Sequence, residues 1–129
     1  MKRWLPILLL VACAPAMAPF ADGACASSDG DTCETGTGRL LQCINGKWVI
    51  FSDCHGPQGC SQNGDTTFCD TTGNTGGDFC APTSEGRVRC EPDGGSQILQ
   101  CMDHVLTAIY ECEAPKRCGS EDGGLTCVY

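Results

Sequence analysis

Two pairs of short apolar segments, each bounded by turn-forming residues, are typical of β-strands. The first pair covers residues 40–44 and 47–51, and the second covers residues 98–102 and 105–110. Only two residues separate the segments of each pair, which is the spacing of a tight hairpin turn. The rest of the chain is dominated by Gly, Ser, Thr, Asp and Pro, which favour turns. The pattern therefore predicts two β-hairpins and little helix.

The first hairpin has the stronger turn signal, because Asn45-Gly46 separates its segments and both residues tolerate the positive φ of a type I′ turn. This register places Cys43 opposite Trp48 and Leu41 opposite Ile50 on one face. The cysteine identifies that face as the inward one.

In the second hairpin Asp103-His104 takes the turn position, and it is a poorer turn pair than Asn-Gly. The same geometry places Leu106 opposite Cys101. We therefore expect the same inward face in both hairpins.

The N-terminus carries an apolar run at residues 4–12, preceded by Lys2 and Arg3. The run is far shorter than the roughly 20 residues that a membrane-spanning helix needs. A short positive start followed by such a run is typical of a signal peptide. We therefore assign residues 1–12 to a signal peptide.

The motif Leu10-Val11-Ala12-Cys13 resembles the lipobox of bacterial lipoproteins. The resemblance implies cleavage before Cys13 and acylation of this cysteine, with palmitate among the attached chains. Several acyl chains on one residue give stable anchoring. Ala14 follows the cysteine, and by the sorting rule of Gram-negative bacteria this implies the outer membrane. Residues 13–24, rich in Ala and Pro, then form a tether.

The alternative is an ordinary secretory signal, cleaved at Ala16-Met17-Ala18 or at Ala21-Asp22-Gly23, which yields a secreted protein without a lipid. The cysteine count favours the lipoprotein. The chain has 13 cysteines, and removing Cys13 leaves an even number for disulfides.

Thirteen cysteines in 129 residues predict a disulfide scaffold outside the reducing cytosol. The competing interpretation is a zinc protein, but zinc ligands usually come in cysteine pairs two to four residues apart. The closest pairs here, Cys54 with Cys60 and Cys112 with Cys118, are six positions apart. We expect no metal site and no cofactor.

The cysteines after the tether form two sets of six, and the last four of each set repeat at an offset of 58 residues. The sets are Cys25, Cys33, Cys43, Cys54, Cys60 and Cys69, then Cys80, Cys90, Cys101, Cys112, Cys118 and Cys127. We predict a small, disulfide-rich, mainly β fold with two tandem homologous hairpin modules, residues 25–70 and 79–129. Residues 71–78 are rich in Gly and Thr, and this composition predicts a flexible linker.

Six cysteines allow 15 pairings per module, and the spacing does not decide among them. Because the repeat is the structural unit, we expect every disulfide to form within a module. Modules this small have too little core to be stable alone, and each disulfide adds roughly 2–4 kcal/mol.

The formal net charge is -8, and no basic cluster exists, so binding to nucleic acid has no electrostatic basis. Asp29-Gly30-Asp31 is the nearest approach to a calcium loop, but it lacks the EF-hand spacing. His55 and His104 have no catalytic motif around them. We therefore expect a non-catalytic protein whose function is binding.

The segment from Cys43 to Cys54, with Cys-Ile-Asn-Gly-Lys-Trp at its start, resembles the hairpin of small disulfide-rich chitin-binding modules. The resemblance implies a carbohydrate site of exposed aromatic rings, on which sugars stack. The candidate ligand-binding residues are Trp48, Phe51 and Tyr110. The inward face assigned to Trp48 counts against this residue as a sugar platform.

The whole arrangement, a lipobox followed by paired cysteine-rich modules, resembles outer-membrane lipoproteins of predatory, gliding soil bacteria such as myxobacteria. That resemblance implies a surface protein partner and a role in adhesion or contact-dependent gliding motility. A polysaccharide ligand and a purely structural role in the envelope remain the alternatives.

Overall fold

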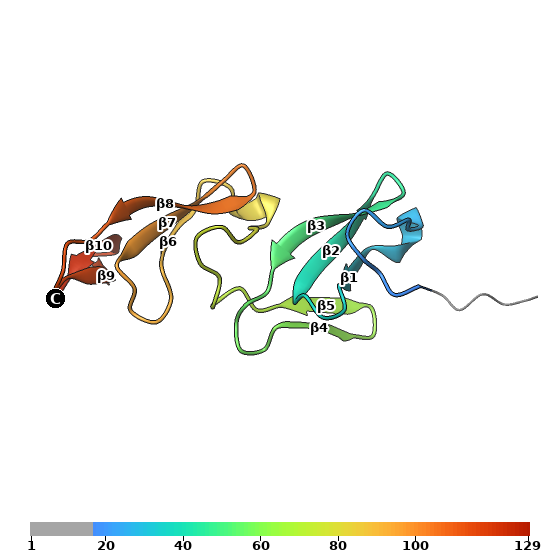
Figure 1. Cartoon of the computed structure of the whole chain (residues 1–129), viewed down its shortest axis with the longest axis horizontal. Helices are drawn as coiled ribbons and strands as arrows, with labels where there is room; N and C mark the ends of the chain where they lie inside the picture. Colours follow the sequence, from blue (N-terminus) through green and yellow to red (C-terminus); the bar gives the residue numbers. More distant parts are fainter. Residues whose placement is uncertain (1–16) are drawn as a thin grey trace, which may run out of the picture.

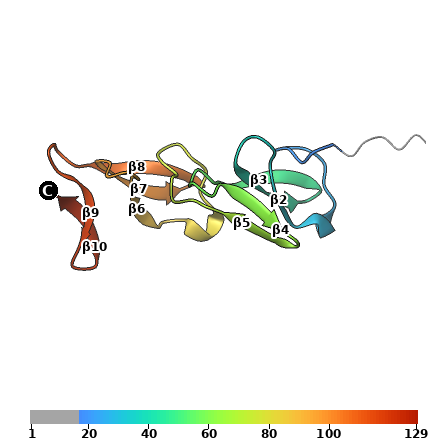
Figure 2. The same ribbon diagram turned by 90° about the horizontal axis from the view of Figure 1, so that it is seen from below.

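The computed structural model describes residues 17–129 and shows a small, mainly β protein with two three-stranded and two two-stranded antiparallel sheets. Two similar modules follow each other along the long axis (Figure 1), and the turned view shows the same order (Figure 2). The predicted fold class is confirmed. The expected signal peptide and Cys13 lie outside the described residues.

The first module starts with a short 3₁₀ turn, η1 (Ser27–Asp29), and continues with five strands. A sheet in the order β1-β2-β3 is followed by the β4–β5 hairpin. The strands are β1 (Asp31–Cys33), β2 (Arg39–Ile44), β3 (Lys47–Asp53), β4 (Cys60–Asn63) and β5 (Thr66–Cys69).

The second module repeats this order. It has η2 (Pro82–Ser84), a sheet in the order β6-β7-β8 and the hairpin of β9 and β10. The strands are β6 (Val88–Cys90), β7 (Gln97–Met102), β8 (Val105–Glu111), β9 (Arg117–Glu121) and β10 (Gly124–Val128). A register shift occurs at the same place in both sheets, between Leu40 and Leu41 and between Ile98 and Leu99.

Both hairpins have the predicted register. Cys43 pairs with Trp48, and Cys101 pairs with Leu106. Asp103 and His104 have φ angles of 51° and 67°, so this poorer turn pair adopts the same left-handed backbone as Asn-Gly. The strands extend one or two residues beyond the predicted ends, because the pairing continues past the register shift in each sheet.

The two modules share one disulfide pattern, in which the first cysteine pairs with the third, the second with the fifth and the fourth with the sixth. All six bonds form within a module, as expected. The pairs are Cys25–Cys43, Cys33–Cys60, Cys54–Cys69, Cys80–Cys101, Cys90–Cys118 and Cys112–Cys127.

The core of each module is a thin layer beside the first disulfide. Leu41 and Leu99 are fully buried, and Trp48 is only 6% exposed. In the second module Leu99 and Leu106 pack with the Cys80–Cys101 disulfide. Because so few apolar side chains are buried, the disulfides carry much of the stability.

The chain before each first cysteine runs along the free edge of the hairpin. We call residues 20–24 and 75–79 strap 1 and strap 2. The N–H of Trp48 donates to the carbonyl of Gly23 at 2.8 Å, and the N–H of Leu106 donates to the carbonyl of Asp78 at 2.8 Å. The repeat therefore includes the strap, so strap 2 overlaps the expected linker.

Candidate functional site

The two modules are joined at the end of β3 by a pair of hydrogen bonds between Asp53 and Phe79. The N–H of Asp53 donates to the carbonyl of Phe79 at 3.0 Å. In return, Oδ2 of Asp53 accepts a hydrogen bond from the N–H of Phe79 at 2.7 Å. The second carboxylate oxygen accepts from Nε of Arg39 at 3.2 Å. Asp53 is buried, so these partners offset the cost of burying its charge.

Asn74, which belongs to the expected linker, packs its side chain beside this contact. Its Nδ2 donates to the carbonyl of Asp53 at 2.7 Å, and its Oδ1 accepts from the N–H of His55 at 2.8 Å. The side chain is 1% exposed. A buried amide with both ends hydrogen-bonded fixes the backbone around it. Residues 71–78 are therefore an ordered junction, which differs from the flexible linker that their composition predicted.

A contact between His55 and Asp78 closes the same junction at the surface. Nδ1 of His55 lies 2.9 Å from Oδ2 of Asp78, and Nε2 lies 3.9 Å from Oδ1 of Asp53. The imidazole is partly exposed, whereas the Asp53 carboxylate is not. His55 thus bridges the first module and strap 2, instead of being an isolated surface histidine.

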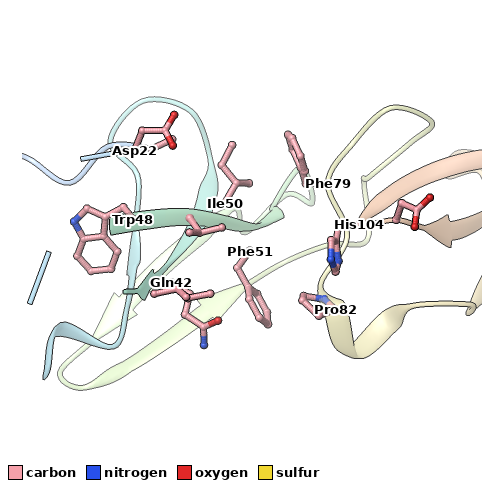
Figure 3. A pocket seen from close by; sticks show the side chains of 12 residues that line it. Asp22, Gln42, Trp48, Ile50, Phe51, Phe79, Pro82 and His104 are labelled. Carbon is pink, nitrogen blue, oxygen red and sulfur yellow. The ribbon is translucent and has the colours of Figure 1, made fainter. Parts of the chain in front are cut away.

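The junction creates a groove of about 430 Å³ between the modules. Figure 3 shows its side chains, with Trp48 and Asp22 at one end, Pro82 and His104 at the other, and Phe51 between them. β3 forms the floor, strap 1 one end, and strap 2 with the β7–β8 turn the other. The lining residues are Ala21, Asp22, Gln42, Ile44, Trp48, Val49, Ile50, Phe51, Phe79, Pro82, Asp103 and His104.

The groove is apolar along its length and acidic at its ends. Ile44 and Val49 each expose more than two fifths of their surface, although such residues are usually covered. Asp22 lies at the end beside Trp48 (Figure 3), and Asp103 lines the groove from the β7–β8 turn, directly before His104 in the chain. A groove with an apolar floor and two carboxylates suits a ligand that has an apolar group flanked by positive charges.

The edge of β3 is open at Ile50. Strap 1 pairs with Trp48 through Asp22 and Gly23, and Phe79 pairs with Asp53. Alternation along an antiparallel strand turns the N–H and C=O of Ile50 to the same side as those of Trp48. No backbone partner for Ile50 on that side occurs within residues 17–129. The groove therefore offers one free backbone position beside its apolar floor.

The three candidate ligand-binding residues do not form one surface. Trp48 contributes to the groove but is buried, as its inward register predicted, and Phe51 lies on the groove floor. Tyr110 is 58% exposed in β8 of the second module and does not line the groove. The three residues therefore lie in three different settings: Trp48 is buried, Phe51 lines the groove, and Tyr110 is exposed outside it.

Phe79, Pro82 and Asp103 line the groove but were not predicted as site residues. They belong to the second module, whereas the groove floor belongs to the first. The repeat offered one signal, because Phe79 stands directly before the first cysteine of its module, where the first module has the small residue Ala24.

Two carboxyl groups bind strap 1 and the start of the junction, respectively. The pKa of Glu34 lies below its ordinary value, chiefly because the Thr37 hydroxyl donates to it. The N–H of Ala21 in strap 1 also donates to Glu34, at 2.6 Å. The pKa of Asp70 is lowered as well, by hydrogen bonds from Thr72 and then from the N–H of Gln58. Both groups favour the charged form in the folded protein.

Among residues 17–129, no cluster of three His, Cys, Asp or Glu side chains is arranged to hold a metal ion. No helix in this part of the chain is both long and apolar enough to cross a bilayer.

Comparison with known proteins finds no matching family model, no similar curated protein and no similar solved structure.

Proposed function

We propose that the protein is a non-catalytic, lipid-anchored surface protein that binds another surface protein through the groove between its modules. The groove carries this proposal, because it is apolar, acidic at both ends and held open by an ordered junction. The ligand is an extended protein segment with an apolar centre and basic flanks. Its backbone pairs with the free position at Ile50, in the manner of β-strand addition.

The ordered junction supports this proposal. A groove between two freely moving modules loses affinity, because binding must first order the walls. Here Asp53, Phe79 and Asn74 fix the second module against the first. The lining is therefore in place before a ligand arrives.

A stacked sugar is less well supported at this site. Sugar stacking needs a flat aromatic face that is open to solvent, and the Trp48 ring is covered. Of the other two candidate residues, Phe51 lies on the groove floor and Tyr110 does not line the groove. Retention on insoluble chitin and cellulose tests this alternative directly. Retention that is lost on changing Phe51 and Tyr110 to Ala supports sugar and contradicts the protein partner.

Site-specific photocrosslinking tests the proposed function. A photoreactive phenylalanine analogue replaces Phe51 in the groove, and the chain is displayed on cells of the organism that produces it. We expect one dominant crosslinked protein, and its crosslinked peptide should have an apolar centre with flanking Lys or Arg.

A matched control places the same analogue at Phe68, which is exposed in β5 and outside the groove. Asp22→Asn and Asp103→Asn should each weaken the crosslink at position 51 and reduce its sensitivity to salt. Equal crosslinking at positions 51 and 68, or none at position 51, contradicts the proposal.

A further inference from the structure

A second cavity, of about 200 Å³, lies at the junction beside β6, and two arginines line it. Phe51 and Phe79 line the groove. The residues that follow them in the chain, Ser52 and Cys80, line this second cavity instead. We call it the arginine pocket, after Arg87 and Arg89.

Arg89 is held in place by the junction. Its Nη1 donates to the carbonyl of Thr71 at 2.8 Å, and its Nη2 donates to the carbonyl of Thr72 at 3.0 Å. A guanidinium has five N–H donors, so three remain for another acceptor. The backbone of Arg87 is fixed as well, since its N–H donates to the carbonyl of Ser84 at 2.9 Å and its carbonyl accepts from Cys101 at 3.0 Å.

Neither arginine has a carboxylate partner among residues 17–129, although the chain has 16 acidic residues. The acidic neighbours in sequence are engaged elsewhere. Glu85 accepts hydrogen bonds from the N–H groups of Asp103 and His104. Glu91 accepts one from the hydroxyl of Thr75. Both arginines therefore line the pocket without an ion-pair partner in this part of the chain.

The first module shows that the fold does not need arginines here. The ladders align Arg89 with Thr32, because these residues pair with Leu99 and Leu41. The bond from the N–H of Cys101 to Arg87 corresponds to the bond from Cys43 to Gly30. The same positions thus hold a glycine and a threonine in a module with the same strands and disulfides.

We propose that the arginine pocket binds the carboxylate of an acidic sugar, a uronate unit of a polysaccharide. Paired guanidinium groups bind carboxylates with charge-assisted hydrogen bonds. The cavity is smaller than the roughly 300–1,000 Å³ typical of drug-sized ligands, which suits a single sugar ring.

The other walls match a sugar better than an acidic peptide. Thr71 and Ser84, which each carry a hydroxyl, also line the pocket. A hydroxyl can pair with the hydroxyls of a sugar, which an Asp or Glu side chain lacks. Val88 and Leu106 supply an apolar wall for the C–H face of the ring. This site is separate from the protein-binding groove, so either can exist without the other.

The test is an amide NMR titration of the disulfide-bonded chain with trigalacturonate at low salt. Two matched ligands accompany it: the methyl ester of the same trisaccharide, which keeps the hydroxyls and loses the charge, and a pentaglutamate peptide. We expect trigalacturonate to shift the amides of Ser84, Arg87 and Arg89, with much weaker binding of the ester and the peptide. Arg87→Gln should weaken trigalacturonate binding about tenfold or more, as for a lost charged hydrogen bond.

Arg117→Gln is the control, because Arg117 is an exposed arginine in β9 outside the pocket. It should leave the dissociation constant within about twofold. Unshifted amides elsewhere in each variant show that the fold is kept. The proposal is overturned by no binding, by equal binding of the ester, by tighter binding of pentaglutamate, or by an equal loss in Arg117→Gln.

Discussion

The carboxylate of Asp53 and the backbone N–H of Phe79 are 2.7 Å apart across the boundary between the two modules. Asp53 is the last residue of β3, and Phe79 is the last residue of strap 2. With the return bond from the N–H of Asp53 to the carbonyl of Phe79, this contact continues the edge of the first sheet into the second module. The relative position of the modules therefore depends on this buried carboxylate, together with Asn74 and the contact between His55 and Asp78.

Asp53→Ala should destabilise the protein and loosen the junction. The change leaves the N–H of Phe79 and Nε of Arg39 without their acceptor, at a cost of about 2–3 kcal/mol in the free energy of unfolding. Urea denaturation measures the cost, and residual dipolar couplings should show the modules reorienting independently. Asp65→Asn, in the exposed turn between β4 and β5, should change neither. Retention of one rigid body in Asp53→Ala contradicts the assignment.

The stability of the protein should fall at acidic pH. Hydrogen bonds lower the pKa of Glu34 and of Asp70 below their ordinary values of 4.5 and 3.8. The folded state therefore prefers both carboxylates charged, and it releases protons that the unfolded chain retains. This contribution is complete above the unfolded pKa values and is lost as the pH falls through the folded ones.

We expect the free energy of unfolding to be level above pH about 5 and to decline below pH about 4 for this reason. Asp70→Asn should flatten part of that decline, since the substituted side chain no longer titrates. Urea denaturation at a series of pH values gives both curves. An unchanged slope in Asp70→Asn shows that Asp70 does not contribute.

Much of the fold was predictable because its determinants are local. Asn45-Gly46 set the register of the first hairpin, and the offset of 58 residues transferred that register to Asp103-His104. The inward position of Trp48 followed from its place opposite Cys43. The disulfide pairing was not predictable beyond its confinement to modules, because spacing alone leaves many closures with similar loop lengths.

The candidate site was less predictable because it is built from contacts between modules. Residues 71–78 have the composition of a flexible linker, and only the contacts of Asn74 with Asp53 and His55 make them ordered. No periodic pattern signals a single buried amide. In the sequence Phe79 is marked only by its position before Cys80. Its contact with the first module depends on Asp53, which ends β3 and lies 26 positions earlier in the chain.

Gly73→Ala should be strongly destabilising, because an added Cβ would overlap the carbonyl of His55. The neighbour is backbone that already bonds to Asn74, so it has little freedom to move. Overpacking of this kind costs about 1–3 kcal/mol. Thermal denaturation measures the loss. Gly76→Ala is the matched control, since its nearest neighbours would lie at 3.8 Å or more; similar melting temperatures for the two variants contradict the close approach at Gly73.

The lipid anchor is tested by the intact mass of the mature protein, isolated without reductant from a Gram-negative host. We expect a chain that starts at Cys13, carries acyl groups and lacks the twelve hydrogens of six disulfides. Cys13→Ser should abolish the acylated species and leave all six disulfides, because each of the other cysteines already has a partner within its module. A lipid-free mass that starts beyond Ala18 contradicts the anchor, and the surface protein would then be a secreted one. A variant mass with fewer than six disulfides would instead show that Cys13 takes part in pairing.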